Sequence, residues 1–145
     1  TPTSSIMYLG TAGSTVFASS DYIAYCFAEK KGYSKFSSFV GNGSNDGSYI
    51  HLGFKPALFI WKQTTNKNWH IKDNKRLASF NPANGHLYPN QANVEEDYAD
   101  FDFLSNGVKI RHNGTDVNES SGTYIYLAFA ESPFTNSNGV PTNAR

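Results

Sequence analysis

Apolar and polar residues alternate with a period of two along much of the chain, which is typical of β-strands. Two segments, residues 22–29 and 124–131, are the clearest cases and are identical at five of their eight positions. Neither face of these segments is polar, so we predict that each is an interior strand covered on both sides. The pair also indicates an internal repeat, with one full module between the copies.

Further strands are predicted over residues 34–40, 49–52, 57–61 and 69–72, because Gly, Asn and Pro residues that favour turns separate these runs. The run 57–61 is the most apolar of the middle region, and we predict it to be a central strand.

The run 69–72 alternates in a way that predicts which side chains are exposed. Trp69 and Ile71 fall on one face, and His70 and Lys72 fall on the other. Because the second pair is polar, we expect that face to be in contact with water.

The most specific local signal is a hairpin over residues 101–111. The pair Asn106-Gly107 lies between two alternating runs, as a two-residue type I′ turn requires. The predicted register places Phe103 opposite Ile110 on the inner side and Asp102 opposite Arg111 on the outer side.

Periodicity fails from residue 77 to residue 100, where we predict a long irregular but ordered loop of functional importance. The predicted fold is therefore all-β, an antiparallel β-sandwich of jelly-roll-like form with one long irregular loop. Residues 1–29 are expected to be the terminal hairpin of a preceding module or the N-terminal strands of the sandwich. Residues 30–134 are expected to form the sandwich module, and residues 135–145 a C-terminal tail.

Composition narrows the classes of partner. Lys and Arg together number 12, as do Asp and Glu, and this zero net charge without a basic stripe argues against nucleic acid and anionic membranes. No apolar stretch is long enough to span a bilayer, so no membrane insertion is expected. The chain begins with Thr and is expected to be a piece of a longer polypeptide. The single cysteine, Cys26, is expected to be a buried small hydrophobic residue.

No constellation of residues predicts chemistry. The histidines are scattered without metal-ligand spacing, and no Ser/His/Asp set or nucleophile elbow can be singled out. A run of carboxylates offers oxygens for calcium but lacks the spacing of a calcium loop, so a solvated acidic face is favoured. We therefore expect no catalytic residues, no metal and no cofactor; the acidic run consists of Glu95, Glu96, Asp97, Asp100 and Asp102.

A binding surface is the remaining candidate. Sugar recognition pairs an aromatic plate with amide and carboxylate hydrogen bonds, and the predicted loops contain both kinds of group. The candidate contacts for a glycan or receptor are Asn66, Asn68, Trp69, His86 and Tyr88. The alternative is that Trp69 and Tyr88 belong to the core or to an interface.

Several motifs resemble a known family. They include the first repeat copy, Gly53-Phe-Lys-Pro-Ala57, Phe101-Asp-Phe-Leu-Ser-Asn-Gly107 and Gly122-Thr-Tyr-Ile-Tyr126. Together they resemble an uncharacterised repeat module of marine bacteriophage tail and tail-fibre proteins, and the ending of the chain looks like the C-terminal copy.

The resemblance implies a non-catalytic structural protein of the virion. In this interpretation the chain is the C-terminal module of a tail fibre or similar surface appendage involved in host attachment. Its partners would be other virion chains, copies of itself in a homo-oligomer, for which a trimer is the expectation, and a host surface glycan. Two alternatives remain open, a carbohydrate-binding lectin-like module and a capsid decoration protein.

Overall fold

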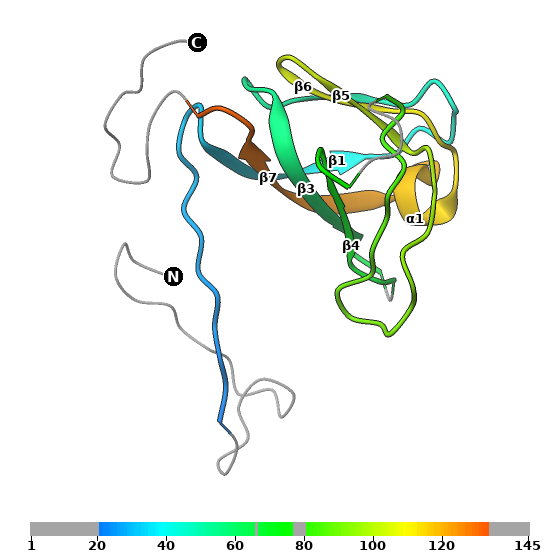
Figure 1. Cartoon of the computed structure of the whole chain (residues 1–145). Helices are drawn as coiled ribbons and strands as arrows, with labels where there is room; N and C mark the ends of the chain where they lie inside the picture. Colours follow the sequence, from blue (N-terminus) through cyan, green and yellow to red (C-terminus); the bar gives the residue numbers. More distant parts are fainter. Residues whose placement is uncertain (1–20, 66, 77–80, 134–145) are drawn as a thin grey trace.

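Two antiparallel sheets face each other in the computed structural model, which describes residues 21–65, 67–76 and 81–133 (Figure 1). Sheet A has the strand order β1-β7-β3-β4, and sheet B has the order β2-β6-β5. The elements are β1 (Ser34–Val40), β2 (Tyr49–His51), β3 (Pro56–Gln63), β4 (His70–Asp73), β5 (Phe101–Leu104), β6 (Gly107–Ile110), the short helix α1 (Thr115–Asn118) and β7 (Thr123–Ala130). The fold is therefore an all-β sandwich, as predicted.

Aromatic side chains fill the space between the sheets. Phe59 and Trp61 of β3 project from sheet A toward Phe101 of sheet B, with ring centroids 5.4 and 4.7 Å from the Phe101 ring. Tyr124 and Tyr126 of β7 belong to the same buried cluster. Large aromatic rings contribute much apolar area per residue, which explains how a short chain builds a substantial core.

The second repeat copy forms the strand that the sequence predicts. β7 lies between β1 and β3 and pairs with both along most of its length. Its alternate residues point inward to the core, but its outer face is not covered as predicted, because Ile125 on that face is 39% exposed. The predicted central position of residues 57–61 is also confirmed, because β3 pairs with both β7 and β4.

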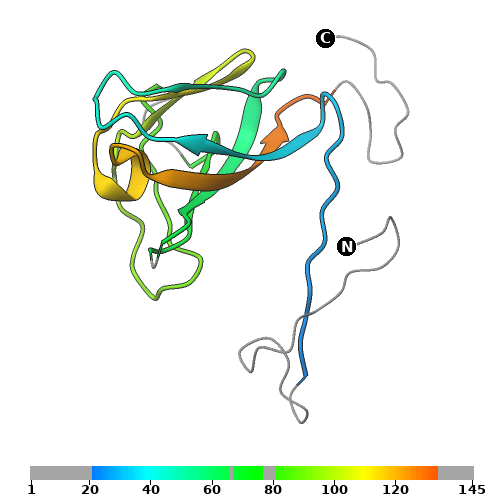
Figure 2. The same cartoon turned by 180° about the vertical axis from the view of Figure 1, so that it is seen from behind.

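The first repeat copy does not form a strand, and the prediction of a covered interior strand is wrong for residues 22–29. Residues 21–29, here called the arm, are extended and run away from the sandwich (Figures 1 and 2). Ile23 and Tyr25 are 81% and 80% exposed. Cys26 is exposed too, so its predicted burial is wrong. The physical reason is that no strand of the described residues flanks the arm as β1 and β3 flank β7.

The hairpin over residues 101–111 exists, but its turn and register differ from the prediction. Phe103 lies opposite Val108, and Leu104 opposite Gly107, so the connecting residues are Ser105 and Asn106. Asn106 has no positive φ, which a type I′ turn would require. Gly107 is needed for close packing instead, because a Cβ there would lie 2.3 Å from the backbone oxygen of Ile50 on β2.

The predicted contact between Asp102 and Arg111 is present despite the different register. Arg111 Nε donates to Asp102 Oδ2 at 2.5 Å, although Asp102 lies opposite Lys109 in the ladder. The predicted pair of opposite charges therefore forms as a diagonal contact across the hairpin.

The predicted exposure of β4 is reversed. His70 and Lys72 are 1% and 0% exposed, so the face expected to be in water is the inner one. They lie opposite Trp61 and Phe59 of β3, whose side chains point into the core. Polar groups tolerate this burial only when partners satisfy them, and residues 81–100 of the irregular loop supply those partners.

Candidate binding pocket

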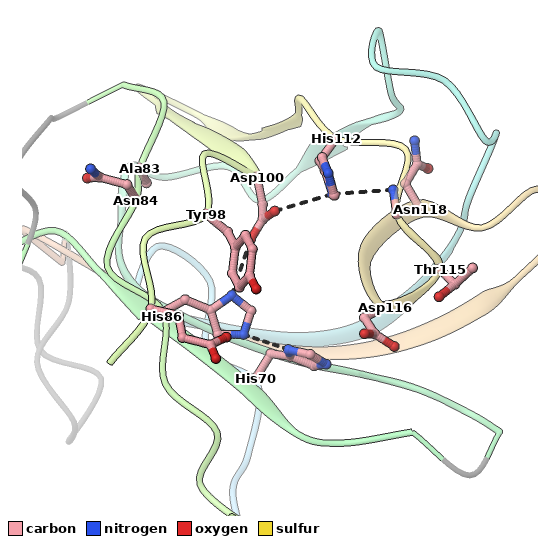
Figure 3. A network of polar contacts seen from close by, with 12 residues as sticks. His70, Ala83, Asn84, His86, Tyr98, Asp100, His112, Thr115, Asp116 and Asn118 are labelled. Atoms are coloured by element: carbon pink, nitrogen blue, oxygen red, sulfur yellow. Dashed lines mark hydrogen bonds and ion pairs between the residues drawn. The ribbon is translucent and has the colours of Figure 1, made fainter. Parts of the chain in front are cut away.

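The inner face of β4, the loop of residues 81–100 and the helix α1 enclose a pocket of about 240 Å³ (Figure 3). These segments are far apart in the sequence and meet only because β4 is the edge strand of sheet A beside the loop. The pocket is lined by His70, His86, Tyr88, Tyr98, Asp100, His112, Gly114, Thr115, Asp116 and Val117.

Lys72 attaches the loop to β4 underneath the pocket. Its ammonium group donates to the backbone oxygens of Ala83 and Asn84 at 3.0 Å each and to the backbone oxygen of Tyr98. It also lies 3.3 Å from Asp100 Oδ2. Burial lowers the pKa of Lys72, while the charge of Asp100 acts in the opposite direction. Because an ammonium can only donate, three carbonyl oxygens and one carboxylate favour its charged form.

Asp100 is buried, yet its environment favours the carboxylate. Burial by itself would raise its pKa, but the hydrogen bond with His86 and the charge of Lys72 outweigh burial, and the net effect is a lowered pKa. His86 Nδ1 lies 3.3 Å from Asp100 Oδ2, and His86 Nε2 lies 2.7 Å from His70 Nδ1. The chain Asp100–His86–His70 is therefore a continuous polar network in the lining of the pocket (Figure 3).

His70 ends this network as a neutral ring. Burial, together with the neighbouring His86, lowers the pKa of His70 to about 4. Its ring stacks on Trp61 with a centroid distance of 5.0 Å and an interplanar angle of 13°. When His86 is also neutral and donates through Nδ1 to Asp100, His70 must donate through Nδ1, which leaves its Nε2 as an acceptor. That buried Nε2 has no hydrogen-bond partner within the described residues.

Two tyrosines form the aromatic wall of the pocket. The hydroxyl of Tyr88 donates to Glu96 Oε2 at 3.0 Å, and burial followed by this hydrogen bond raises the Tyr88 pKa. The negative charge of Glu96 also raises the pKa of Tyr98. Backbone hydrogen bonds of 2.8 and 3.0 Å between His86 and Glu96 fix the loop that carries both rings. The wall is therefore neutral, aromatic and held in place.

The opposite side of the pocket is polar and more exposed. His112 Nδ1 lies 3.3 Å from the backbone nitrogen of Gly114 and 3.5 Å from Asp100 Oδ1. His112 Nδ1 accepts from Gly114 in the tautomer that carries its proton on Nε2, and it donates to Asp100 when the proton is on Nδ1. Asp116 Oδ1 pairs with Lys67 at 3.1 Å beside the opening. Hydrogen-bond donors and acceptors thus lie on the side of the pocket opposite the two tyrosines.

The structure brings together only part of the set predicted for ligand contact. His86 and Tyr88 line the pocket. Asn68 and Trp69 lie outside the lining and are held at Asn90: Asn68 Oδ1 accepts from Asn90 Nδ2 at 3.1 Å, and the backbone nitrogen of Trp69 donates to Asn90 Oδ1 at 3.1 Å. Both are partly exposed. Asn66 lies outside the described residues.

Sequence reasoning missed the grouping of the histidines. His70, His86 and His112 appear scattered along the chain but line one pocket, while His51 lies on β2 in the other sheet. The sequence signal that could have found them is weak: a histidine and a lysine alternate on β4, next to a loop containing Asp100. A polar alternate face predicts exposure to water, although the same alternation is equally compatible with a buried polar network.

The acidic run is not a solvated face throughout. Asp100 and Asp102 are buried and paired with Lys72 and Arg111, whereas Glu95 and Asp97 are exposed. Tertiary pairing with distant cations accounts for this division. Within the described ranges, no three His, Cys, Asp or Glu side chains are grouped so that they could hold a metal ion.

Comparison with known protein families gives a match over nearly the whole chain. A family model described as a domain of unknown function, DUF7483, matches residues 1–133. The chain belongs to the DUF7483 family. The match includes the arm, the sandwich and the pocket alike. No curated protein and no solved structure matches the chain. In the part of this DUF7483 domain that the structure describes, no helix is long and apolar enough to cross a membrane.

Proposed function

We propose that this DUF7483 domain is a non-catalytic binding module that recognises a sugar unit of a host-surface polysaccharide. In this proposal it is the C-terminal module of a bacteriophage tail fibre or similar virion appendage, and it takes part in host attachment. The observation that carries the proposal is the pocket, which combines Tyr98 and Tyr88, the latter fixed by its hydrogen bond to Glu96, with a set of hydrogen-bonding groups.

The chemistry of the pocket suits a neutral, hydroxyl-rich ligand. An aromatic wall offers an apolar face to the C–H groups of a sugar ring, and Asp116, His112 and Thr115 offer donors and acceptors for its hydroxyls. The buried network of Lys72 and Asp100 holds the loop before any ligand arrives, so little ordering is needed on binding.

The two carboxyl groups of the pocket support a function in sugar binding more than one in glycoside hydrolysis. Glycoside hydrolysis needs one carboxyl group that is protonated near neutral pH and a second one that is ionised. The pocket contains two carboxyl groups, but Asp100 has a lowered pKa and is bound by Lys72 and His86, while Asp116 pairs with Lys67. Asp100, which its partners hold in the ionised form, is therefore a poor general acid.

The virion part of the proposal is supported by the motifs that resemble the phage tail module. A capsid decoration protein would have the same fold and differ only in its place on the particle. Immuno-electron microscopy of intact particles with antibodies against this chain would distinguish them. Labelling at the tip of a fibre supports the proposal, and labelling spread over the capsid contradicts it.

The binding part is tested by Tyr98→Ala in the full chain, with Tyr49→Ala as the matched control. The two tyrosines are 45% and 43% exposed, but only Tyr98 lines the pocket. Binding to host cells and to a glycan array should weaken about tenfold or more in Tyr98→Ala, because an aromatic anchor in a pocket contributes more than a rim residue. Tyr49→Ala should bind as the unaltered chain does.

Trp69→Ala gives the sharper discrimination between pocket and surface. Trp69 is outside the pocket lining, so its removal should leave glycan binding unchanged. Circular dichroism of each variant checks that the fold is retained. Loss of binding in Trp69→Ala together with normal binding in Tyr98→Ala would reject the pocket and place recognition on the surface near Asn90.

A further inference from the structure

The arm presents an apolar strand sequence that its own sandwich does not cover. Ile23 and Tyr25 are four-fifths exposed, and no charged residue occurs from position 22 to position 28. Exposed apolar side chains in a contiguous row mark interaction sites more often than scattered ones do. Phe27 of the arm contacts the body, which comprises the described residues from 30 to 133; its ring centroid lies 5.8 Å from those of Phe36 and Phe129.

The surface next to Phe27 is a groove with the same chemistry. It measures about 530 Å³ and runs over the outer face of β1 and β7, where Phe36, Ser38, Ile125 and Leu127 line it. None of these four side chains is charged, so the arm and the groove match in polarity. Phe27 itself lines one side of the groove, which shows that an arm side chain fits this surface.

The edge of β1 offers backbone groups as well as a groove. β1 is the end strand of sheet A, and β7 lies on its other side. Among the described residues, an isolated antiparallel β-bridge joins Lys30 to Ser34 at the outer edge of β1, next to the turn that leads into the arm. An extended chain can add to such an edge through main-chain hydrogen bonds while its alternate side chains fill pockets.

We propose that the arm docks along the β1 edge and the adjoining outer face of sheet A in a second copy of this chain. The partner is a second copy because the arm and β7 have related sequences, so the outward row of the arm repeats the outward row of β7: Ile23, Tyr25 and Phe27 correspond to Ile125, Leu127 and Phe129. Both rows are therefore apolar surfaces of similar shape. In a two-fold dimer each chain would give its arm to the other, so the same contact forms twice.

The geometry explains why the arm does not cover its own groove. The contacts of Phe27 hold it against the end of sheet A, and from there the arm runs away from the body (Figures 1 and 2). Nine extended residues reach roughly 30 Å, enough to place Ile23 and Tyr25 on a neighbouring molecule. A Tyr buries about 150–250 Å², so Tyr25 and Ile23 of two arms, counted together with the surface that they cover, bury on the order of 1,000 Å², the lower end of specific interfaces.

This inference is independent of the glycan pocket, because the groove and the pocket share no residue. Sedimentation velocity of the full chain over a range of concentrations measures the association. The unaltered chain should form a species larger than a monomer, and Tyr25→Asp should weaken association about tenfold or more. Ile125→Asp, on the receiving surface, should weaken it similarly. Val94→Asp is the matched control, since Val94 is 80% exposed at another place, and it should associate normally.

Cross-linking identifies which copy supplies the arm. A chain carrying Cys26→Ser and Ser38→Cys has one thiol on β1, and the unaltered chain has one on the arm, so a disulfide between these two chains must join two molecules. Oxidising the mixture should yield a cross-linked dimer that Tyr25→Asp in the unaltered chain abolishes. A protein that stays monomeric, an association that Val94→Asp weakens equally, or an association without this cross-link overturns the proposal.

A single chain carrying Ser38→Cys with Cys26 intact completes the test. If the disulfide forms only within one chain, and the product migrates as a monomer, the arm folds onto its own β1 edge and the second copy is excluded. Glycan binding by Tyr25→Asp should remain normal, so loss of assembly is distinguishable from loss of the pocket.

Discussion

The two copies of the repeat have nearly the same sequence and opposite environments. Five of eight residues are identical, yet β7 is a central strand with inward-facing residues in the core, while the arm is exposed along its length. Alternating apolar residues therefore make a segment able to form a strand, whereas neighbouring strands determine whether the strand forms. In β7 those neighbours are β1 and β3.

The largest expected contrast comes from placing a charge at the matched positions Ala128 and Cys26. Ala128 is fully buried in β7, so Ala128→Asp should lower the free energy of unfolding by roughly 3–5 kcal/mol or prevent folding. Cys26→Asp in the exposed arm should change it by less than about 0.5 kcal/mol. Urea unfolding of the monomeric chain at low concentration, followed by tryptophan fluorescence, measures both, and equal effects would show that the arm is covered by its own body.

The second prediction, with a somewhat smaller expected effect, is that acidic pH lowers the stability of the body through His70, whereas the arm contains no such group. The pKa of His70 falls from 6.5 to about 4 on folding, so the unfolded chain binds a proton that the folded chain does not. Stability is therefore fully present above pH 6.5 and declines by about 3 kcal/mol as the pH falls toward 4. Asp100, whose pKa is lowered below 3.8, contributes its own loss only at more acidic pH.

The control for this titration is His70→Gln, which removes the titrating ring. The slope of the unfolding free energy between pH 6.5 and 4.5 should become much shallower in this variant. The arm holds no histidine, so self-association of the unaltered chain should change far less than stability over the same range. A slope that persists unchanged in His70→Gln would assign the proton uptake to another group.

The smallest contrast concerns the matched pair Phe129 and Phe27, which touch each other and both touch Phe36. Phe129→Ala should destabilise the body by about 2 kcal/mol, because Phe129 is partly buried in β7. Phe27→Ala should cost about 1 kcal/mol or less, since Phe27 is 58% exposed. Thermal unfolding by calorimetry resolves the two, and a larger loss in Phe27→Ala would mean that the arm's anchor is part of the core.

The candidate pocket was only partly predictable. His86 and Tyr88 were identified because an irregular loop with aromatic and polar residues is a common place for binding. For His70 and Lys72 the sequence predicts exposure to solvent, since a polar alternate face is usually in contact with water. Their burial depends on Asp100 and on carbonyl groups that are far along the chain, and no local pattern contains those partners.

Local sequence is enough to predict the class of fold, the positions of β1, β3 and β7, and the irregular loop, because alternation, chain-breaking residues and apolar runs act within a few neighbouring residues. Contacts between distant segments set the hairpin register, the burial of His70 and Lys72, and the different environments of the two repeat copies. These depend on which distant segment supplies a hydrogen bond or covers an apolar face. Gly107 illustrates the point: its sequence suggests a turn, but the close approach of β2 is what requires it.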